Sequence, residues 1–308
     1  MKIAVLGAGA MGCLFAAKLS ACHDVTVIGR NAARMESVRA EGIRVIEQDG
    51  SLLRGAPSAA LPGDALGVCD LVLVFVKAMA TEAALEGIRS AIGPDTLLLT
   101  LQNGVGHEDV LSRFAPMENV LVGTTQHNAS VREDGSIYHG GSGVTVIGSL
   151  VGNNRAAEAV AQAFEQAGFD MQASRDVRRA VWQKLMTNAS LSALTGVFQM
   201  PMGFVTGSES AWTLCRMLIR EAVAVAAADG VVFDAEEKIE EVRRVGVNGP
   251  MGITSICADL RHGRATEVDT ISGSVVRAAR RLGLAAPHHE MMVLLIHAFE
   301  DKNKALAD

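Results

Sequence analysis

The chain has 308 residues, with 28 Lys and Arg against 34 Asp and Glu, and a formal net charge of −6. At about 150 residues per domain, this length predicts two domains. Hydrophobic residues make up 49% of the chain and charged residues 20%, which supports a large core and excludes wholesale disorder. The acidic balance argues against a nucleic-acid-binding protein, and no apolar run approaches the roughly 18 residues of a membrane span.

The cysteines and the N-terminus indicate where the protein works. Five Cys are widely spaced without a Cys-x-x-Cys pair, which fits a reducing cytoplasm better than a disulfide framework or a zinc site. The apolar start resembles a signal peptide, but Lys18 interrupts it and glycines recur there at fixed spacing. His288 and His289 are adjacent, not four apart, and indicate a helix start. We therefore expect a cytoplasmic protein without a metal.

The first half of the chain alternates short apolar runs with helical stretches. A helix is expected at 11–21, and strands are expected at 3–6, 25–28, 71–76, 97–101 and 120–123. Such apolar strands, separated by helices, predict a parallel sheet covered on both faces. Residues 136–148 read as two short strands around a Gly-rich turn, and predict antiparallel strands that finish the same sheet.

Strand patterns stop after about residue 174. Apolar residues then recur at helical spacing over 177–195, 208–229, 234–245, 254–282 and 288–303. We predict the α/β fold class, with an N-terminal Rossmann-type dinucleotide-binding domain over residues 1–173 and a C-terminal all-helical domain over 174–308 that binds substrate. Trp212, Leu214 and Met217 are candidates for a homodimer face, but core packing explains them equally well.

A complete G-x-G-x-x-G motif follows the first strand and opens the first helix. Its residues are Gly7, Ala8, Gly9, Ala10, Met11 and Gly12. The glycines allow a tight turn, a close approach to a pyrophosphate and close helix–strand packing, while the helix N-terminus offers N–H groups to phosphate. We interpret the motif as a dinucleotide site. The alternatives are a turn without a ligand and an S-adenosylmethionine-binding methyltransferase.

The end of the second strand indicates which dinucleotide binds. An NAD enzyme usually places Asp or Glu there, whereas this sequence reads Gly29-Arg30-Asn31, with no carboxylate before Glu36. A carboxylate would repel a 2′-phosphate, and Arg30 can pair with it bidentately. We therefore expect NADPH, against the alternative that Arg30 is a solvated surface charge.

Lys77 and Asn103 each follow a predicted strand of the first domain. Ligands in open α/β sheets bind beyond the carboxyl ends of the strands, so we expect both residues near the nicotinamide half of the cofactor. An Asn-Gly pair alone is only a turn signal.

Two polar sets stand out in the helical half. Lys184, Asn188 and Ser192 recur at i, i+4 and i+8, which places them on one face of a predicted helix. Ser255 starts the predicted helix 254–282, and Glu267 lies twelve residues further along it. The alternatives are a solvated lysine, a plain helix start at Thr254-Ser255 and an exposed glutamate.

These motifs, in this order, resemble the ketopantoate reductase (2-dehydropantoate 2-reductase) family over nearly the whole chain. The resemblance rests on the Gly motif, Arg30, Lys77, Gln102-Asn103-Gly104, Gly123-Thr124-Thr125, Trp182-Gln183-Lys184-Leu185-x-x-Asn188 and Arg264-x-Thr266-Glu267-Val268-Asp269. The most specific pieces are the helix with Lys184 and Asn188 and the segment with Thr266 and Glu267.

The resemblance implies reduction of a 2-oxo acid by NADPH in a cleft between the domains. Lys184 would donate the proton to the developing alkoxide, and Glu267 would orient the substrate hydroxyl end and contact the cofactor. Asn103 and Asn188 would hold substrate and nicotinamide in register, and Ser255 would bind the carboxylate. Ala129 would contact the cofactor through its backbone. Ketopantoate would then become D-pantoate, a step of pantothenate biosynthesis.

The sequence departs from the family at Ser192, at Met202, and at Gly252-Ile253 before Ser255, where the family has more polar residues. All of these departures fall on the substrate side, so the reaction type is better supported than the identity of the acid. A D-2-hydroxy-acid dehydrogenase acting on another branched 2-oxo acid stays open, because fewer amides in the pocket favour a less hydroxylated substrate. A non-catalytic NADP(H)-sensing protein is the alternative from another class.

Overall fold

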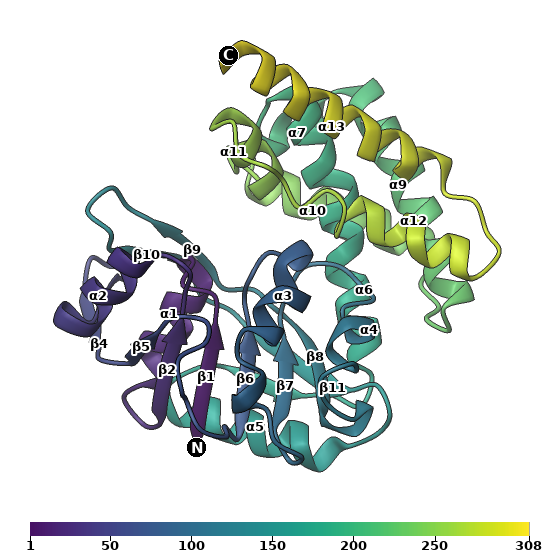
Figure 1. Ribbon diagram of the computed structural model, residues 1–308. Helices are drawn as coiled ribbons and strands as arrows, with labels where there is room; N and C mark the ends of the chain where they lie inside the picture. Colours follow the sequence, from purple (N-terminus) through teal and green to yellow (C-terminus); the bar gives the residue numbers. More distant parts are fainter. Residues whose placement is uncertain (308) are drawn as a thin grey trace. The chain divides into compact units, whose positions relative to one another are not determined.

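The computed structural model describes residues 1–307 of the chain (Figure 1). It divides into two compact units. The first consists of Met1–Gln102 and His107–Ala180, and the second of Asn103–Gly106 and Val181–Asp308. The four residues Asn103–Gly106 therefore belong with the helical half of the chain, although the residues on both sides of them belong to the first unit.

An eight-stranded sheet forms the centre of the first unit (Figure 1). Its strands are β1 (Lys2–Leu6), β2 (Asp24–Ile28), β5 (Ser58–Ala60), β6 (Leu71–Val74), β7 (Leu97–Thr100), β8 (Val120–Thr125), β11 (Thr145–Ser149) and β12 (Met171–Ala173). They lie in the order β12-β11-β8-β7-β6-β1-β2-β5. Neighbouring strands are parallel except for β8 and β11, so the predicted parallel sheet is confirmed.

The strand order reverses at β1. The chain runs from β1 to β2 and β5 on one side, and then returns to β6 on the other side of β1. In open α/β sheets, ligands bind beyond the carboxyl ends of the strands at such a switch point. The loop after β1 carries residues 7–9 and leads into α1, the loop after β6 carries Lys77, and both leave the sheet there.

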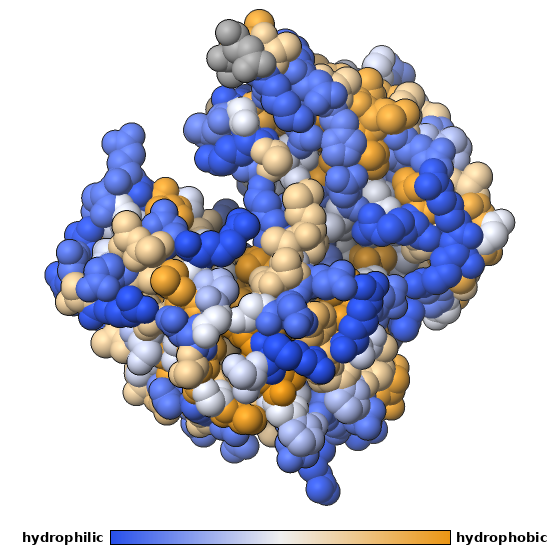
Figure 2. Space-filling model, viewed as in Figure 1, coloured by the Kyte–Doolittle hydropathy of each residue, from blue (hydrophilic) through white to orange (hydrophobic). Residues whose placement is uncertain are grey.

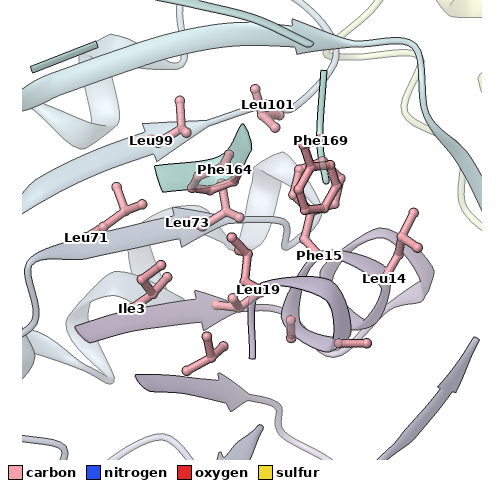
Figure 3. Close-up of a cluster of buried hydrophobic side chains, with 14 of the residues drawn as sticks. Ile3, Leu14, Phe15, Leu19, Leu71, Leu73, Leu99, Leu101, Phe164 and Phe169 are labelled. Atoms are coloured by element: carbon pink, nitrogen blue, oxygen red, sulfur yellow. The ribbon is translucent and has the colours of Figure 1, made fainter. Parts of the chain in front are cut away.

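Helices cover both faces of this sheet, because its strands are apolar on both sides. Ile3 and Val5 of β1 pack in one buried cluster and Ala4 and Leu6 in another. Figure 3 shows the first cluster, in which strand residues such as Leu73 meet Phe15 of α1 (Ala10–Leu19) and the rings of Phe164 and Phe169. The remaining helices of the unit are α2 (Ala32–Glu41), α3 (Thr81–Glu86), α4 (Glu108–Leu111), α5 (Asn154–Gln166), and the 3₁₀ turns η1 (Ala78–Ala80), η2 (Arg89–Ala91) and η3 (Met117–Asn119).

A second, four-stranded sheet lies beside α1 and was not predicted. Its order is β4-β3-β10-β9, with β3 (Ile43–Ile46), β4 (Leu52–Gly55), β9 (Asn128–Val131) and β10 (Ile137–Gly141). The predicted strand pair over 136–148 is wrong in its pairing, since β10 pairs with β9 and β3 whereas β11 pairs with β8 and β12. The real hairpin is β9–β10, and its turn contains Asp134 and Gly135, the latter at φ 76°. An Asp-Gly pair is a known hairpin signal.

The second unit consists of helices and loops, with no strand among its described residues, as predicted. It contains most of α6 (Val177–Thr187), then a π-helix (Asn188–Ser192), α7 (Ala193–Phe198), α8 (Met202–Gly207), α9 (Glu209–Ala228), α10 (Ala235–Asn248), α11 (Ser255–Arg261), α12 (Ser272–Arg281) and α13 (Pro287–Ala307). One buried cluster gathers around Trp182 and another around Leu191 and Cys215. Trp212 belongs to the second cluster and is only 9% exposed, so it packs in the core.

The single helix predicted over 254–282 is wrong. α11 ends at Arg261, α12 begins at Ser272, and Gly263 between them has φ 63°. Glycine adopts this left-handed conformation easily, and it commonly ends a helix. Glu267 therefore lies in the turn before α12 and not on a helix.

No helix among the described residues is long and apolar enough to cross a membrane. Figure 2 shows hydrophobic residues scattered among hydrophilic ones on the visible face.

Candidate active site

The Gly-rich loop of the first unit is built as a tight turn against the next strand. Gly7 has φ 120°, and a Cβ on it would lie 2.8 Å from the backbone nitrogen of Val76. A Cβ on Gly12 would lie 1.8 Å from the Gly7 carbonyl oxygen. Neither position accepts a side chain without moving backbone, so these two glycines allow the loop to fold closely onto β6 and α1.

Gly9 differs, because a Cβ built there meets nothing within 4 Å. It is the N-cap of α1, and no side chain caps this helix end. The first N–H groups of α1 therefore have no side-chain cap, and the positive end of the helix dipole lies beside them. The charge of a pyrophosphate group suits this helix end, and Gly9 leaves space beside it.

Arg30 and Arg34 near the end of β2 have different surroundings. Arg30 is exposed and makes no hydrogen bond or ion pair with the part of the chain that the structure describes. The Arg34 guanidinium donates to the Gly135 carbonyl at 2.9 Å and to Cys13 Sγ at 3.8 Å. Of the two, Arg30 is therefore the one whose guanidinium can take an added phosphate without breaking a contact.

Two other predicted cofactor residues lie in the first unit. Lys77 is exposed and directly precedes η1. Ala129 lies on β9, paired with His139 of β10, and packs against the buried cluster of α1 and the main sheet.

Three of the predicted site residues are joined by hydrogen bonds within the second unit. Asn103 donates from Nδ2 to Glu267 Oε2 at 3.2 Å and accepts at Oδ1 from Asn188 Nδ2 at 3.4 Å. These side chains come from three separate segments of the chain. The Asn103 amide thus connects the turn before α12 to the helix that carries Lys184.

Lys184 lies one helical turn before Asn188 on α6 and is partly buried. Burial lowers its pKa to about 8, while the negative charge of Glu267 raises it. Burial disfavours the ammonium form because it removes the charge from water, and the nearby carboxylate restores part of that loss. An ammonium group with a pKa near neutrality is suited to giving up a proton.

The other two predicted substrate residues, Ser192 and Ser255, have no hydrogen bond to this cluster among the contacts described. Ser192 ends the π-helix, whose turn takes one residue more than an α-turn, so it does not continue the regular face of Lys184 and Asn188. Its carbonyl accepts from Thr195 Oγ1 at 2.9 Å and from Thr254 Oγ1 at 3.4 Å. Ser255 is exposed at the first position of α11, and Thr254 caps that helix by accepting from Cys257 N.

No group of three or more His, Cys, Asp or Glu that could hold a metal ion occurs among residues 1–307. His289 is buried, and its Nε2 lies 3.1 Å from the Leu218 carbonyl, while His288 Nδ1 lies 2.6 Å from Glu221. The pair therefore helps to fix the start of α13.

Comparison with known proteins assigns both halves of the chain to one family. A family model described as ketopantoate reductase PanE/ApbA matches residues 3–152, and the C-terminal model of that family matches residues 176–300. The chain belongs to the ketopantoate reductase family. A 2-dehydropantoate 2-reductase of Halobacterium salinarum is 34% identical over 290 residues, which cover 93% of this chain and 95% of the relative.

Solved structures agree with this family. D-mandelate dehydrogenase, in a ternary structure with NADH and anilino(oxo)acetate, matches with a TM-score of 0.91 and 28% identity over 99% of both chains. A PanE/ApbA family ketopantoate reductase from Ralstonia eutropha matches with a TM-score of 0.87 and 30% identity, over 99% of this chain and 100% of that one. The predicted fold class and family are confirmed. The protein is an oxidoreductase of the 2-dehydropantoate 2-reductase family, which implies a dinucleotide cofactor and a small 2-oxo acid.

Two of the departures from the ketopantoate reductase pattern are in contact with each other. A Cβ on Gly252 would lie 2.3 Å from Met202 Cε, so the Met202 side chain fills the space that a larger residue at 252 would need. Met202 N also donates to the Gly252 carbonyl at 3.0 Å. The two substitutions therefore form one packing unit and not two separate changes.

Proposed function

We propose that this protein reduces ketopantoate to D-pantoate with NADPH, with Lys184 as the proton donor. The observation that carries the proposal is the cluster of Asn103, Asn188 and Glu267, joined by hydrogen bonds, with Glu267 acting electrostatically on the partly buried ammonium of Lys184. A lysine that is only a solvated surface charge does not require a hydrogen-bonded carboxylate beside it.

The cofactor supplies a hydride to the C2 carbonyl carbon of the substrate. As negative charge develops on the carbonyl oxygen, the Lys184 ammonium stabilises it and then transfers a proton to it from Nζ. Glu267 keeps Lys184 protonated in its partly buried position and orients the hydroxyl end of the substrate. The amides of Asn103 and Asn188 hold the substrate and the nicotinamide side in register, and the hydroxyls of Ser192 and Ser255 bind the substrate, Ser255 at its carboxylate.

The cofactor would be held by residues of the first unit. The uncapped N-terminus of α1 and the open space at Gly9 fit the pyrophosphate, and Lys77 and the backbone of Ala129 add contacts. The exposed, unpaired guanidinium of Arg30 is available for a 2′-phosphate. This residue is the basis for NADPH over NADH.

A second candidate is a D-2-hydroxy-acid dehydrogenase that acts on another branched 2-oxo acid. The similarity to D-mandelate dehydrogenase favours it, as does the thioether of Met202 packed against Gly252. An apolar wall accepts a less hydroxylated acid more readily than a wall of amides does.

NADPH oxidation by the purified protein tests both candidates when ketopantoate is compared with 2-oxoisovalerate and 2-oxoisocaproate. We expect kcat/KM to be highest for ketopantoate. A clear preference for another acid would assign the substrate to the second candidate and keep the reaction. Tight NADPH binding without turnover on any acid would indicate a non-catalytic NADP(H)-sensing protein and contradict the proposal.

A further inference from the structure

Gln102 lies two residues after the end of β7, and its side-chain amide makes three hydrogen bonds within the first unit. Nε2 donates to the Val76 carbonyl at 2.6 Å and to Thr81 Oγ1 at 3.0 Å. Oε1 accepts from Thr100 Oγ1 at 2.8 Å. A carbonyl oxygen can only accept, so the contact with Val76 fixes which end of the amide is the donor.

The two acceptors of Nε2 are the two ends of one short segment. Val76 follows β6, Thr81 begins α3, and between them lie residues 77–80, which contain Lys77 and the η1 turn. Lys77 and Met79 are exposed, whereas Thr81 is only 2% exposed. One amide group therefore pins both ends of an otherwise exposed segment, from the buried side.

The pinned segment also borders the Gly-rich loop. A Cβ on Gly7 would lie 2.8 Å from the Val76 nitrogen, and Phe75 N donates to the Leu6 carbonyl at 2.8 Å. A shift of Val76 would therefore change the support of the loop after β1 as well as the position of Lys77. Both loops leave the sheet at the switch point where ligands bind.

We propose that Gln102 is a positioning residue that holds the 77–80 segment so that Lys77 is presented to the cofactor. The inference rests on the proposed function only in giving Lys77 a cofactor contact. Gln102 acts through Lys77 and the loop, and both N–H groups of its amide already donate to protein partners.

The test is a double-mutant cycle on NADPH affinity, measured by fluorescence titration without substrate. Gln102→Glu keeps the size and the Thr100 contact but replaces the donor by an oxygen that faces the Val76 carbonyl. We expect the Kd for NADPH to rise about tenfold or more, since a lost hydrogen bond with an unsatisfied partner costs about 1–3 kcal/mol. In the Lys77→Ala background, Gln102→Glu should raise Kd by a clearly smaller factor, because only its effect through the Gly-rich loop then remains.

Gln162→Glu is the matched control, because it makes the same change at an exposed position of α5 and should leave Kd unchanged. If Gln102→Glu does not fold, as judged by thermal unfolding, Thr81→Val removes only one of the contacts. It should raise Kd by a smaller factor, which should also be reduced in the Lys77→Ala background. In steady-state assays of Gln102→Glu, KM for NADPH should rise, while kcat at saturating NADPH stays within about twofold of the wild-type value.

The inference is overturned if Gln102→Glu binds NADPH like the wild type, or if its effect is as large with Lys77→Ala as without it. The latter would show that Gln102 supports the fold in general. Absence of NADPH binding by the wild-type protein would instead overturn the proposed function, so the two failures are distinguishable.

Discussion

Lys184 has a pKa of about 8 because its burial outweighs the favourable charge of Glu267. A proton donor must be protonated, so we expect kcat for reduction to fall as the pH rises through about 8. Glu267→Gln removes the charge that raises the pKa of Lys184, and should move this alkaline limb to lower pH. The pH profiles of kcat for the two proteins are the measurement. A limb at the same pH in both would show that Glu267 does not act on the proton donor.

Arg30 gives a separate prediction about cofactor choice. Arg30→Ala should raise KM for NADPH about 10- to 100-fold, since a hydrogen bond to a charged group contributes about 1.5–3 kcal/mol. KM for NADH should change little, because NADH has no 2′-phosphate. Arg155→Ala, at an exposed position of α5, is the control for the loss of a positive charge. Equal weakening of both cofactors would show that Arg30 does not recognise the phosphate.

At the scale of elements, the Gly-rich loop separates effects on folding from effects on binding. A methyl group at Gly9 meets no protein atom, whereas one at Gly12 collides with the Gly7 carbonyl. We expect Gly9→Ala to keep the wild-type Tm and to raise KM for NADPH about tenfold or more, because it fills space beside the helix N-terminus. Gly12→Ala should lower Tm by several degrees, as expected when a substitution strains a packed turn. Unchanged NADPH binding in Gly9→Ala would argue against a pyrophosphate at this loop.

Elements held by local signals could be predicted, and elements held by distant pairing could not. The strands of the parallel sheet and the Gly-rich loop follow from apolar runs and glycine spacing. The small sheet pairs β3 with β10, although these strands lie about 90 residues apart in the sequence. No local sequence pattern predicts this pairing. The Asp134-Gly135 turn was a readable signal of the β9–β10 hairpin that the Gly-rich stretch after Tyr138 obscured.

The same contrast holds within the helical half. The apolar spacing of α11 and α12 runs through the break between them, so only the left-handed Gly263 marks the end of α11. The π-helix at Asn188–Ser192 has no sequence signal that spacing could reveal. The residues of the cluster around Glu267 were nevertheless predicted, since their types and order along the chain do not depend on the local backbone. Gln102 was missed as a positioning residue because its role depends on three contacts from separate segments.

At the scale of the whole molecule, the buried His289 and the half-buried His127 make stability depend on pH. Burial lowers the pKa of His289 to about 4, with Glu221 opposing the shift and His288 adding to it. Burial also lowers the pKa of His127 to about 4, assisted by His139 and Lys18 and opposed by Glu47 and Asp170. Both values lie below the ordinary 6.5, so the unfolded chain binds protons that the folded chain does not.

Stability should therefore decrease as the pH falls from 6.5 towards about 4. For the fully buried His289 the loss amounts to roughly 3 kcal/mol, at about 1.4 kcal/mol for each tenfold change in proton affinity. Tm measured across this range checks the expectation. His289→Gln keeps a donor for the Leu218 carbonyl and should flatten the decline, while His262→Gln at an exposed position should not. A Tm that stays constant down to pH 4 would contradict the buried neutral state of these rings.

In the proposed reaction, Lys184 donates the proton in an NADPH-dependent reduction of ketopantoate. The most direct measurement compares kcat of Lys184→Ala with that of the wild type, together with the Kd of each for NADPH, and uses the exposed Lys304→Ala as control. We expect kcat to fall about 10²- to 10⁴-fold, as for the loss of a general acid, with Kd for NADPH nearly unchanged. Wild-type turnover in Lys184→Ala would contradict the account.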